Sequence, residues 1–309
     1  MKKLCVAVIL SFIAGSIGGV ASAQDTTGTI AGRIVDTQGL VLPGATITAT
    51  GSQGSKSSVT GADGRFTVPF LTPGSYRVHE PTTLYNAMVA PLIKYTIKGA
   101  LWYQGETEAG RAQGDIYGEA LMTLVRDWRR AFAQGDFPFY WVQLANYGNA
   151  TKNGHWMRVQ EGQVKATALR NTGVAIINDI GNPTSIHPTN KQDVGRRLAM
   201  LAQNAGGSPL YRQFTRDGDA IRIWFENAGK ALKVRGGGQL TGFQIAGADG
   251  KYVAAVARVD ATTVVVSSPE ISDPRSVRYA WDYDPTANLI NEWGLPASLF
   301  RTDERDDPR

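Results

Sequence analysis

The spacing of apolar residues changes twice along the 309-residue chain, and these two changes limit what it can fold into. Between residues 27 and 78, short alternating runs are separated by turn signals, a pattern typical of antiparallel strands. Over residues 80–205, continuous apolar strands alternate with amphipathic segments, which favours an α/β domain with a parallel sheet. Strands with Gly/Asp turns return over residues 206–302. We therefore predict regions in the order β, α/β and β, followed by a disordered charged tail at residues 303–309.

The same patterns predict the individual elements. Five short strands at regular spacing predict a small β-sandwich at the front, and the strands of the last region predict a second, sandwich-like region. In the middle region, Leu121, Leu124, Val125 and Trp128 share one face of an amphipathic helix. The predicted strands are residues 29–36, 45–50, 57–60, 65–68, 75–78, 97–103, 139–144, 174–178, 220–225, 242–245, 262–266 and 276–281, and the predicted helical segments are 84–93, 117–133, 156–168 and 190–204.

The N-terminus has the three parts of a secretory signal peptide. Two lysines follow Met1, an apolar stretch covers residues 4–17, and an A-x-A cleavage site occupies residues 21–23. The apolar stretch is too short for a membrane span, although an N-terminal anchor helix is an alternative interpretation. We therefore expect export to a periplasmic or extracellular space, with no membrane span after cleavage of residues 1–23.

Cysteine content and charge exclude several kinds of function. The only cysteine, Cys5, lies inside the predicted signal peptide, so the mature chain would have no disulfide, no cysteine nucleophile and no zinc–thiolate site. The formal net charge of +5 is small for this length, and no block of Lys and Arg stands out. Nucleic-acid binding is therefore not expected.

Of the three histidines, His187 has the sequence context of a functional residue. It follows a predicted buried strand and precedes a predicted helix, and loops at the carboxyl ends of parallel strands are where α/β folds place reacting groups. Pro188 restricts His187 to an extended conformation, and Asn190 is a candidate N-cap of the helix. His79 has no partner motif, and His155 is interpreted as a surface residue that could border a site.

A second loop follows the predicted strand at residues 97–103. Gly105 permits a tight turn, and its N–H could point at an oxyanion. Gln104 could supply an amide donor, and Glu106 could orient or polarise an imidazole. The alternative interpretation is a tight turn with solvated carboxylates.

Two families are recognisable in the chain. The segment GTIAGRIVDTQGLVLPGATITAT…TGADGRFTVPFLTPGSYRV resembles the carboxypeptidase-regulatory-like domain at the front of many TonB-dependent receptors, over residues 27–78. This resemblance implies a non-catalytic module, which here ends one or two strands early. The segments EPTTLYNAMVAPLIKYTIKGALWYQGE, DFPFYWVQLANY, NDIGNPTSIHPTNKQDVGRRLA and GLPASLFRTD resemble the C-terminal portion of the sialate O-acetylesterase family of SGNH hydrolases, over residues 80–302.

The second resemblance implies a partial SGNH-type parallel sheet and hydrolysis of an acetyl ester on a sugar, such as O-acetylated sialic acid. It implies a serine acyl-enzyme with a histidine base, and neither a metal nor an organic cofactor. His187 matches the family's catalytic histidine, and Gln104, Gly105 and Glu106 match the Q-G-E block that lines the site. Glu106 is the first candidate for orienting His187, and Asp179 is the second.

The chain departs from the family pattern in three places. Glu108 stands where the family commonly has Asn, and Ser185 stands where some members have Asp. The block G-Q-S-N-M or G-D-S, which carries the family's nucleophilic serine, is absent, and neither Ser52 nor Ser185 is a convincing substitute. The lost segment would also supply the first strand of the sheet, which would leave an unpaired strand edge.

We therefore expect an exported carbohydrate esterase by family that is inactive or weakly active alone. One alternative is a non-catalytic secreted carbohydrate-binding or interaction protein, and another is a remnant of a receptor-linked outer-membrane protein. The sequence assigns no oligomeric state.

Overall fold

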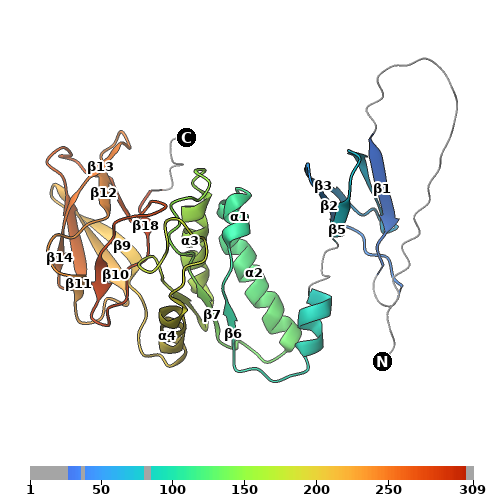
Figure 1. Cartoon of the computed structure of the whole chain (residues 1–309). Coiled ribbons are helices and arrows are strands. Elements are labelled where there is room, and N and C mark those ends of the chain that lie inside the picture. Colours follow the sequence, from blue (N-terminus) through green and yellow to red (C-terminus); the bar gives the residue numbers. More distant parts are fainter. Residues whose placement is uncertain (1–26, 36–38, 80–84, 304–309) are drawn as a thin grey trace, which may run out of the picture. The chain divides into compact units, whose positions relative to one another are not determined.

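A computed structural model describes residues 27–35, 39–79 and 85–303 of the chain (Figure 1). The chain divides into two compact units, residues 1–95 and 96–309. The predicted signal peptide, Cys5 and most of the predicted tail lie outside the described residues. Within the described ranges, no helix is long and apolar enough to cross a membrane.

The first unit contains all five strands predicted from the turn signals, in two antiparallel sheets. One sheet pairs β1 with β4, and the other has the order β3-β2-β5. Alternate residues of these strands, with Ile34, are buried together in one apolar cluster that includes Ile47, Phe66 and Val68. The predicted sandwich arrangement of the sheets stays a prediction. The strands are β1 (Gly28–Arg33), β2 (Thr46–Gly51), β3 (Gly54–Val59), β4 (Arg65–Leu71) and β5 (Tyr76–His79), followed by short helical turns at Tyr85–Val89 and Ala90–Leu92.

The second unit begins with a three-stranded parallel sheet, as the strand–helix alternation predicted. Its order is β6-β7-β8, and its helices follow the strands in sequence. The strands are β6 (Ala100–Trp102), β7 (Phe139–Val142) and β8 (Thr172–Ala175), and the helices are α1 (Glu106–Gly110), α2 (Gly114–Phe132), α3 (His155–Lys165) and α4 (Lys191–Ala202), with a short turn at Ala166–Ala168.

Close packing fixes the positions of α2 and α3. The backbones of Gly118 and Gly162 meet, because a Cβ atom at Gly162 would lie only 2.8 Å from the backbone nitrogen of Gly118. Trp128 of α2 packs edge-on against Trp102 of β6 and Phe139 of β7, with ring centroids 6.3 Å and 5.8 Å apart. These contacts hold the sheet against the helices and thereby set where the loops after β6 and β8 emerge.

One edge of the parallel sheet is unpaired among the described residues. Strand β6 pairs only with β7, and the side chain of Leu101 on β6 is 64% exposed. An apolar side chain on an open strand edge is a feature that folded proteins usually cover. The expectation that a strand of this sheet is missing stays a prediction.

The rest of the second unit is β-rich and includes the four strands predicted there. Antiparallel sheets have the orders β14-β15-β10-β9, β11-β17 and β13-β12-β16-β18, so the chain as a whole has mixed sheets. The sandwich arrangement predicted for this region stays a prediction. The strands are β9 (Leu210–Asp217), β10 (Ala220–Glu226), β11 (Leu232–Val234), β12 (Phe243–Ala246), β13 (Tyr252–Ala254), β14 (Val256–Asp260), β15 (Thr263–Ser267), β16 (Ser276–Tyr279), β17 (Leu289–Asn291) and β18 (Phe300–Arg301).

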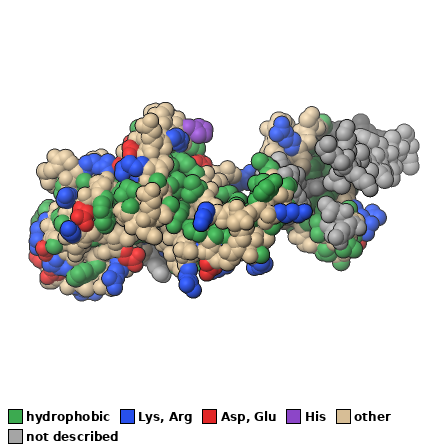
Figure 2. Space-filling view, turned by 90° about the horizontal axis from the view of Figure 1, so that it is seen from below, with side chains coloured by type: hydrophobic (Ala, Val, Ile, Leu, Met, Phe, Trp, Pro, Cys, Tyr) green, Lys and Arg blue, Asp and Glu red, His purple; other side chains and the backbone are tan. Residues whose placement is uncertain are grey.

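Charged side chains are distributed over the surface. Figure 2 shows Lys and Arg side chains spread among Asp and Glu side chains, and no single basic patch covers this face. Several Arg side chains are paired in ion pairs, for example Arg222 with Asp217 and Asp260.

Candidate functional site

The two loops singled out in the sequence come together at the carboxyl ends of β6 and β8. Lys191, the first residue of α4, places its Nζ atom 4.7 Å from the centre of the Tyr103 ring, directly before Gln104. Glu106 and Ile186 line the same cavity of about 210 Å³, and Ile186 is the residue before His187. The geometry therefore places the Gln104–Glu106 loop and the His187 loop around one space.

Gly105 has a conformation and a setting that other residues would not tolerate. Its φ angle is +148°, and a Cβ atom there would lie 2.8 Å from Cγ1 of Val159 and 3.3 Å from Cγ of Leu144. The tight turn predicted from this glycine is present. It lets the chain pass from the end of β6 into α1 while its backbone lies against the buried side chains of Val159 in α3 and Leu144 just after β7.

Gln104 is braced by its neighbours. The Tyr117 hydroxyl lies 2.7 Å from the Gln104 backbone oxygen and 3.1 Å from its side-chain oxygen, and Gln163 donates to the same backbone oxygen over 3.1 Å. The Gln104 amide nitrogen donates a hydrogen bond to the Glu108 carboxylate. One of the two amide protons is therefore committed to Glu108, and the expectation that Gln104 supplies an amide donor stays a prediction.

Glu106 lies in the cavity wall with its charge close to Tyr103. Burial, and in second place the negative charge of Glu106, together raise the pKa of the Tyr103 hydroxyl to about 12. Glu106 is half-buried and is the one charged residue among the described side chains that line this cavity. A carboxylate in this position can accept a hydrogen bond from an imidazole or from a ligand hydroxyl.

His187 lies exposed on its loop, and the loop is fixed around it. Its backbone N–H donates to Oγ of Ser185 over 3.3 Å, and the following Pro188 is buried. The predicted N-cap is confirmed, because the Asn190 side chain accepts a hydrogen bond from the backbone N–H of Asp193 over 3.1 Å. Within the described part of the chain, no hydrogen bond occupies the His187 ring.

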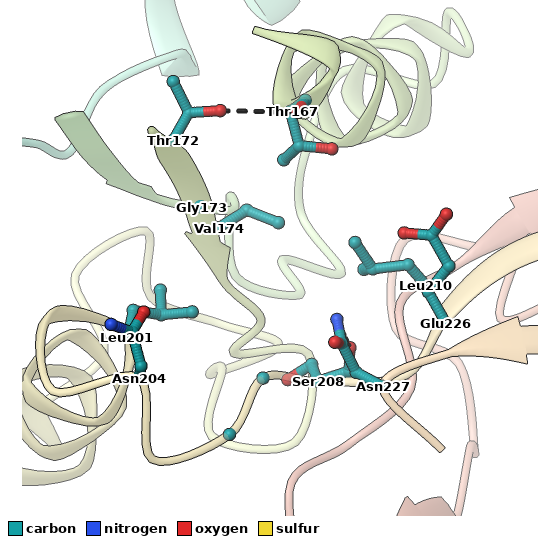
Figure 3. Close-up of a pocket in the computed structure, with 12 residues that line it drawn as sticks. Thr167, Thr172, Gly173, Val174, Leu201, Asn204, Ser208, Leu210, Glu226 and Asn227 are labelled. Atoms are coloured by element: carbon teal, nitrogen blue, oxygen red, sulfur yellow. Dashed lines mark hydrogen bonds between the residues drawn. The ribbon is translucent and has the colours of Figure 1, made fainter. Parts of the chain in front are cut away.

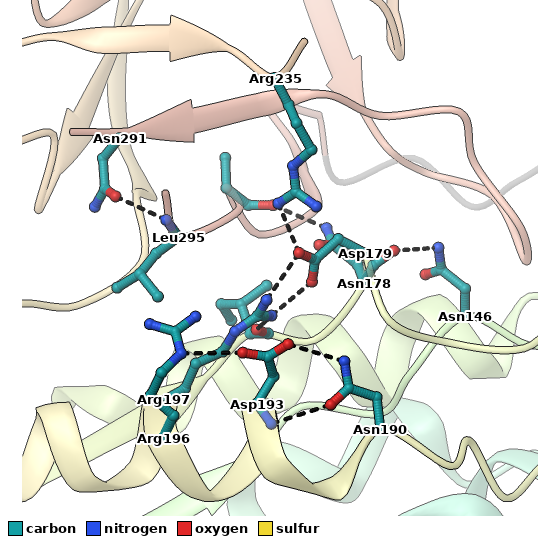
Figure 4. A network of polar contacts seen from close by, with 12 residues as sticks. Asn146, Asn178, Asp179, Asn190, Asp193, Arg196, Arg197, Arg235, Asn291 and Leu295 are labelled. Carbon is teal, nitrogen blue, oxygen red and sulfur yellow. Dashed lines mark hydrogen bonds and ion pairs between the residues drawn. The ribbon is translucent and has the colours of Figure 1, made fainter. Parts of the chain in front are cut away.

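Asp179, the second candidate for orienting His187, is committed elsewhere (Figure 4). Its two carboxylate oxygens bind Arg197 at 2.5 Å and 2.8 Å, and Arg235 lies 2.6 Å away. Burial alone would raise the pKa of this carboxyl group, but the hydrogen bonds and charges of the two arginines hold it below its ordinary value. Asp179 therefore anchors the start of the His187 loop to α4 and to the residue after β11, and its role in orienting His187 stays a prediction.

Of the other two histidines, only His155 has a described side chain. His155 is the first residue of α3, and its Nδ1 atom accepts a hydrogen bond from the backbone N–H of Gly114 over 3.1 Å. This bond gives the ring a structural role at the junction of α2 and α3. His79 ends β5, and its side chain lies outside the described residues.

We find no candidate nucleophile among Ser185, Ser298 and Ser52. Oγ of Ser185 contacts the backbone N–H of His187, and Oγ of the buried Ser298 accepts a hydrogen bond from Gln143 over 2.8 Å. Ser52 lies in the turn between β2 and β3 of the first unit. None of the described residues that line the cavity beside Glu106 is a serine.

Sequence reasoning missed several residues that build this site. The Gln104 loop is held by Tyr117, Gln163 and Tyr103. Of these, Tyr103 could have been found from the sequence, because it directly precedes the Q-G-E block. The contact of Tyr283, in the β-rich region, with the cavity loop could not be predicted from local sequence patterns. Its hydroxyl accepts a hydrogen bond from the backbone N–H of Gly154 over 2.7 Å, and its carbonyl accepts one from Tyr147, a cavity residue, over 2.8 Å.

Comparisons with known proteins agree with both resemblances. Residues 29–80 match the family model of the carboxypeptidase regulatory-like domain, and residues 72–204 match that of the carbohydrate esterases described as sialic acid-specific acetylesterases. Both resemblances inferred from the sequence motifs are confirmed for these segments.

Curated relatives and a solved structure match as well. The chain is 36% identical to mouse sialate O-acetylesterase over 156 residues, which is 44% of this chain and 29% of the mouse protein. It is 33% identical to the human sialate O-acetylesterase over 140 residues, covering 40% of this chain and 27% of that protein. The chain thus spans less than a third of these relatives. A crystal structure of a carbohydrate acetylesterase from Xanthomonas citri matches with a TM-score of 0.70 and 27% identity, covering 91% of this chain and 96% of that one.

Proposed function

We propose that this chain, whose residues 72–204 match the sialic acid-specific acetylesterase family, presents the histidine half of a carbohydrate O-acetylesterase site. The substrate class is an acetyl ester on a sugar, such as O-acetylated sialic acid. The observation that carries the proposal is the convergence of the Gln104–Glu106 loop and the His187 loop on one cavity. The family match alone would not place these two loops together.

In this proposal His187 is the general base and Glu106 orients it. Two anchors favour a fixed ring position: Asp179 holds the start of the loop through Arg197 and Arg235, and Asn190 caps the helix that follows. Glu106 lines the cavity and has no arginine partner among the described residues. An imidazole oriented by a carboxylate is the arrangement that removes a proton from a hydroxyl nucleophile.

The groups that could stabilise an oxyanion fit the family pattern less well than His187 does. Gly105 keeps a backbone N–H at the turn, and we propose this group as a donor to the developing oxyanion. Glu108 lies where the family pattern has Asn, and its carboxylate binds the Gln104 amide. A negative charge next to the oxyanion position disfavours the tetrahedral intermediate, so this departure lowers the rate further.

We propose that the chain alone hydrolyses acetyl esters slowly or not at all. Loss of the nucleophile of a serine hydrolase costs on the order of 10⁶ in kcat. The cavity that Glu106 lines contains no serine among its described residues, and the Ser185 hydroxyl contacts the His187 backbone. The same observations favour the second candidate function, a carbohydrate-binding protein that holds the sugar ester without cleaving it.

Imidazole NMR tests the site directly, because the chain has only three histidines. We expect the His187 signals, assigned with His187→Gln, to shift in a saturable way when O-acetylated sialic acid is added, and to shift less with the unacetylated sugar. His155→Gln identifies the second set of signals and serves as the control. Saturable binding that leaves the His187 signals unmoved, or no binding of the acetylated sugar, would overturn the proposal.

We also propose export of the chain. The predicted cleavage site at residues 21–23 implies that the mature protein begins at Gln24. N-terminal sequencing of the protein isolated from the periplasmic or secreted fraction should find this residue first. A chain that keeps Met1 in that fraction would contradict cleavage.

A further inference from the structure

A second cavity lies at the opposite end of the parallel sheet from His187. Its volume is about 340 Å³, at the lower end of the range typical of small-molecule sites. Thr172 and Gly173 line it at the start of β8, whereas the His187 loop follows the end of this strand. Figure 3 shows that the other walls come from Thr167 in the turn after α3, from the end of α4 and from the residues around β9 and β10. The two cavities are therefore separate.

The walls of this second cavity are mostly polar, and the charge on them is negative. The side chains of Asn204, Ser208 and Asn227 are polar, and the Asn227 amide nitrogen donates to the Ser208 carbonyl over 3.3 Å. Glu226 is the single charged residue among the described residues that line the cavity. The carboxyl end of α4, which ends at Ala202, lies next to it and carries the negative end of the helix dipole. Both features repel an anion and favour a ligand with many hydrogen-bond donors and no negative charge.

The wall around Asn227 is preformed. The fully buried Asn291 donates its side-chain amide to the Gly207 carbonyl over 2.8 Å and to the Asn227 carbonyl over 3.0 Å. Its side-chain oxygen accepts a hydrogen bond from the backbone N–H of Leu295 over 3.1 Å. The Asn291 side chain thus connects the two wall segments that contain Gly207 and Asn227. Binding of a ligand would therefore not carry the entropic cost of ordering these segments.

An exposed aromatic ring borders the same wall. A Cβ atom at Gly206 would lie 3.1 Å from the ring of Trp293, so this ring packs on the Gly206 backbone, and 42% of the Trp293 residue remains exposed. Gly206 itself lines the cavity. A sugar ring has C–H groups on one face and hydroxyls around its edge, and a wall that combines an aromatic face with carboxylate and amide groups matches both.

We propose that this cavity, lined by Glu226, Asn227 and Asn204 and bordered by Trp293, is a second carbohydrate site that takes a neutral sugar. It differs from the candidate esterase site in location and in the charge it accepts. A sugar held here would keep a glycan on the protein while the acetylated residue reaches the His187 cavity.

Titration of the mature full-length chain with single sugars tests this site. We expect galactose or N-acetylglucosamine to bind in a saturable way by calorimetry, with Kd on the order of 1 mM. N-acetylneuraminic acid, which is anionic, should bind this site at least ten-fold more weakly. Glu226→Ala should weaken neutral-sugar binding about ten-fold, Glu226→Gln should weaken it less, and Trp293→Ala should weaken it about three-fold or more.

Matched variants separate this site from the first one. Glu270→Ala and Trp224→Ala remove an exposed carboxylate and an exposed indole elsewhere in the β-rich region, and each should leave the affinity within two-fold. His187→Ala should also leave neutral-sugar binding within two-fold, so a failure of the esterase proposal does not affect this test. No saturable binding of either neutral sugar, an unchanged affinity in folded Glu226→Ala protein, or binding of glucosamine alone would overturn the proposal.

Discussion

The ammonium group of Lys191 lies 4.7 Å from the centre of the Tyr103 ring, and this contact joins the two loops of the candidate site. Lys191 begins α4 four residues after His187, and Tyr103 directly precedes Gln104. A cation over an aromatic face is attracted by the ring's quadrupole. The pair therefore holds the His187 loop next to the Q-G-E loop without a covalent link.

A double-mutant cycle measures this contact. Tyr103→Leu and Lys191→Met should each lower the free energy of unfolding, and the coupling energy between them should be about 0.5–1 kcal/mol because the ring is partly exposed. Urea unfolding of the four proteins gives this value. Lys251→Met, an exposed lysine elsewhere, should show no coupling to Tyr103→Leu, and a coupling near zero for the Lys191 pair would contradict the contact.

Gly105→Ala should destabilise the second unit by about 2 kcal/mol or more. The new methyl group would overlap Val159, and the φ angle of +148° is strained for alanine. Gly110→Ala is the matched control, because a Cβ atom there meets nothing within 4 Å. Alanine is the better helix former, so we expect the control to be neutral or slightly stabilising. Equal stability of the two variants in denaturant unfolding would show that the turn is not as described.

Gln163→Leu should cost about 2–4 kcal/mol. This fully buried side chain donates to the carbonyls of Gln104 and Val142 and accepts from the backbone N–H of Leu144, and leucine would leave all three groups without this partner. Gln244→Leu, at an exposed position of β12, serves as the control and should change stability little. A small loss at Gln163 would mean that water replaces the side chain.

Asp179→Asn should destabilise the protein by about 3–5 kcal/mol at neutral pH, because Arg197 is then left buried with a neutral partner. The pKa of Asp179 is lowered in the folded protein, so on acidification the unfolded chain takes up this proton first. The stabilisation by the carboxylate is full above the unfolded-state pKa of about 3.9 and is lost as pH falls through the lower folded-state value.

The difference in unfolding free energy between wild type and Asp179→Asn should therefore shrink below about pH 4. Asp273→Asn removes a surface partner of Arg216 and Arg275 and should cost about 1 kcal/mol or less. A difference that stays constant from pH 7 to pH 3 would contradict the role assigned to Asp179.

Local patterns predicted the elements better than the contacts between them. The continuous apolar strands and the helix with Leu121 and Val125 on one face were recognisable, because burial imposes a period on each element. Asn190 was recognisable as an N-cap because capping is a local interaction. The ion pair of Asp179 with Arg235 was not predictable, because Arg235 comes from the β-rich region, far along the chain, and no local pattern indicates that pairing.

In the candidate site, too, local features were predictable from the sequence and tertiary contacts were not. His187 and the Q-G-E block were found from their positions after predicted strands and from the family motifs. The commitment of the Gln104 amide to Glu108 follows from their spacing of four residues at the start of α1, but it depends on side-chain orientation. The packing of Tyr283 against the cavity loop depends on tertiary contacts alone.

The measurement that tests the central claim most directly is acetate release from O-acetylated sialic acid by the purified mature chain. Wild type, His187→Ala and buffer should give closely similar rates, because the described residues that line the cavity beside Glu106 include no serine that His187 could activate. Turnover by wild type that His187→Ala abolishes would contradict the account and would show that the chain supplies a nucleophile of its own.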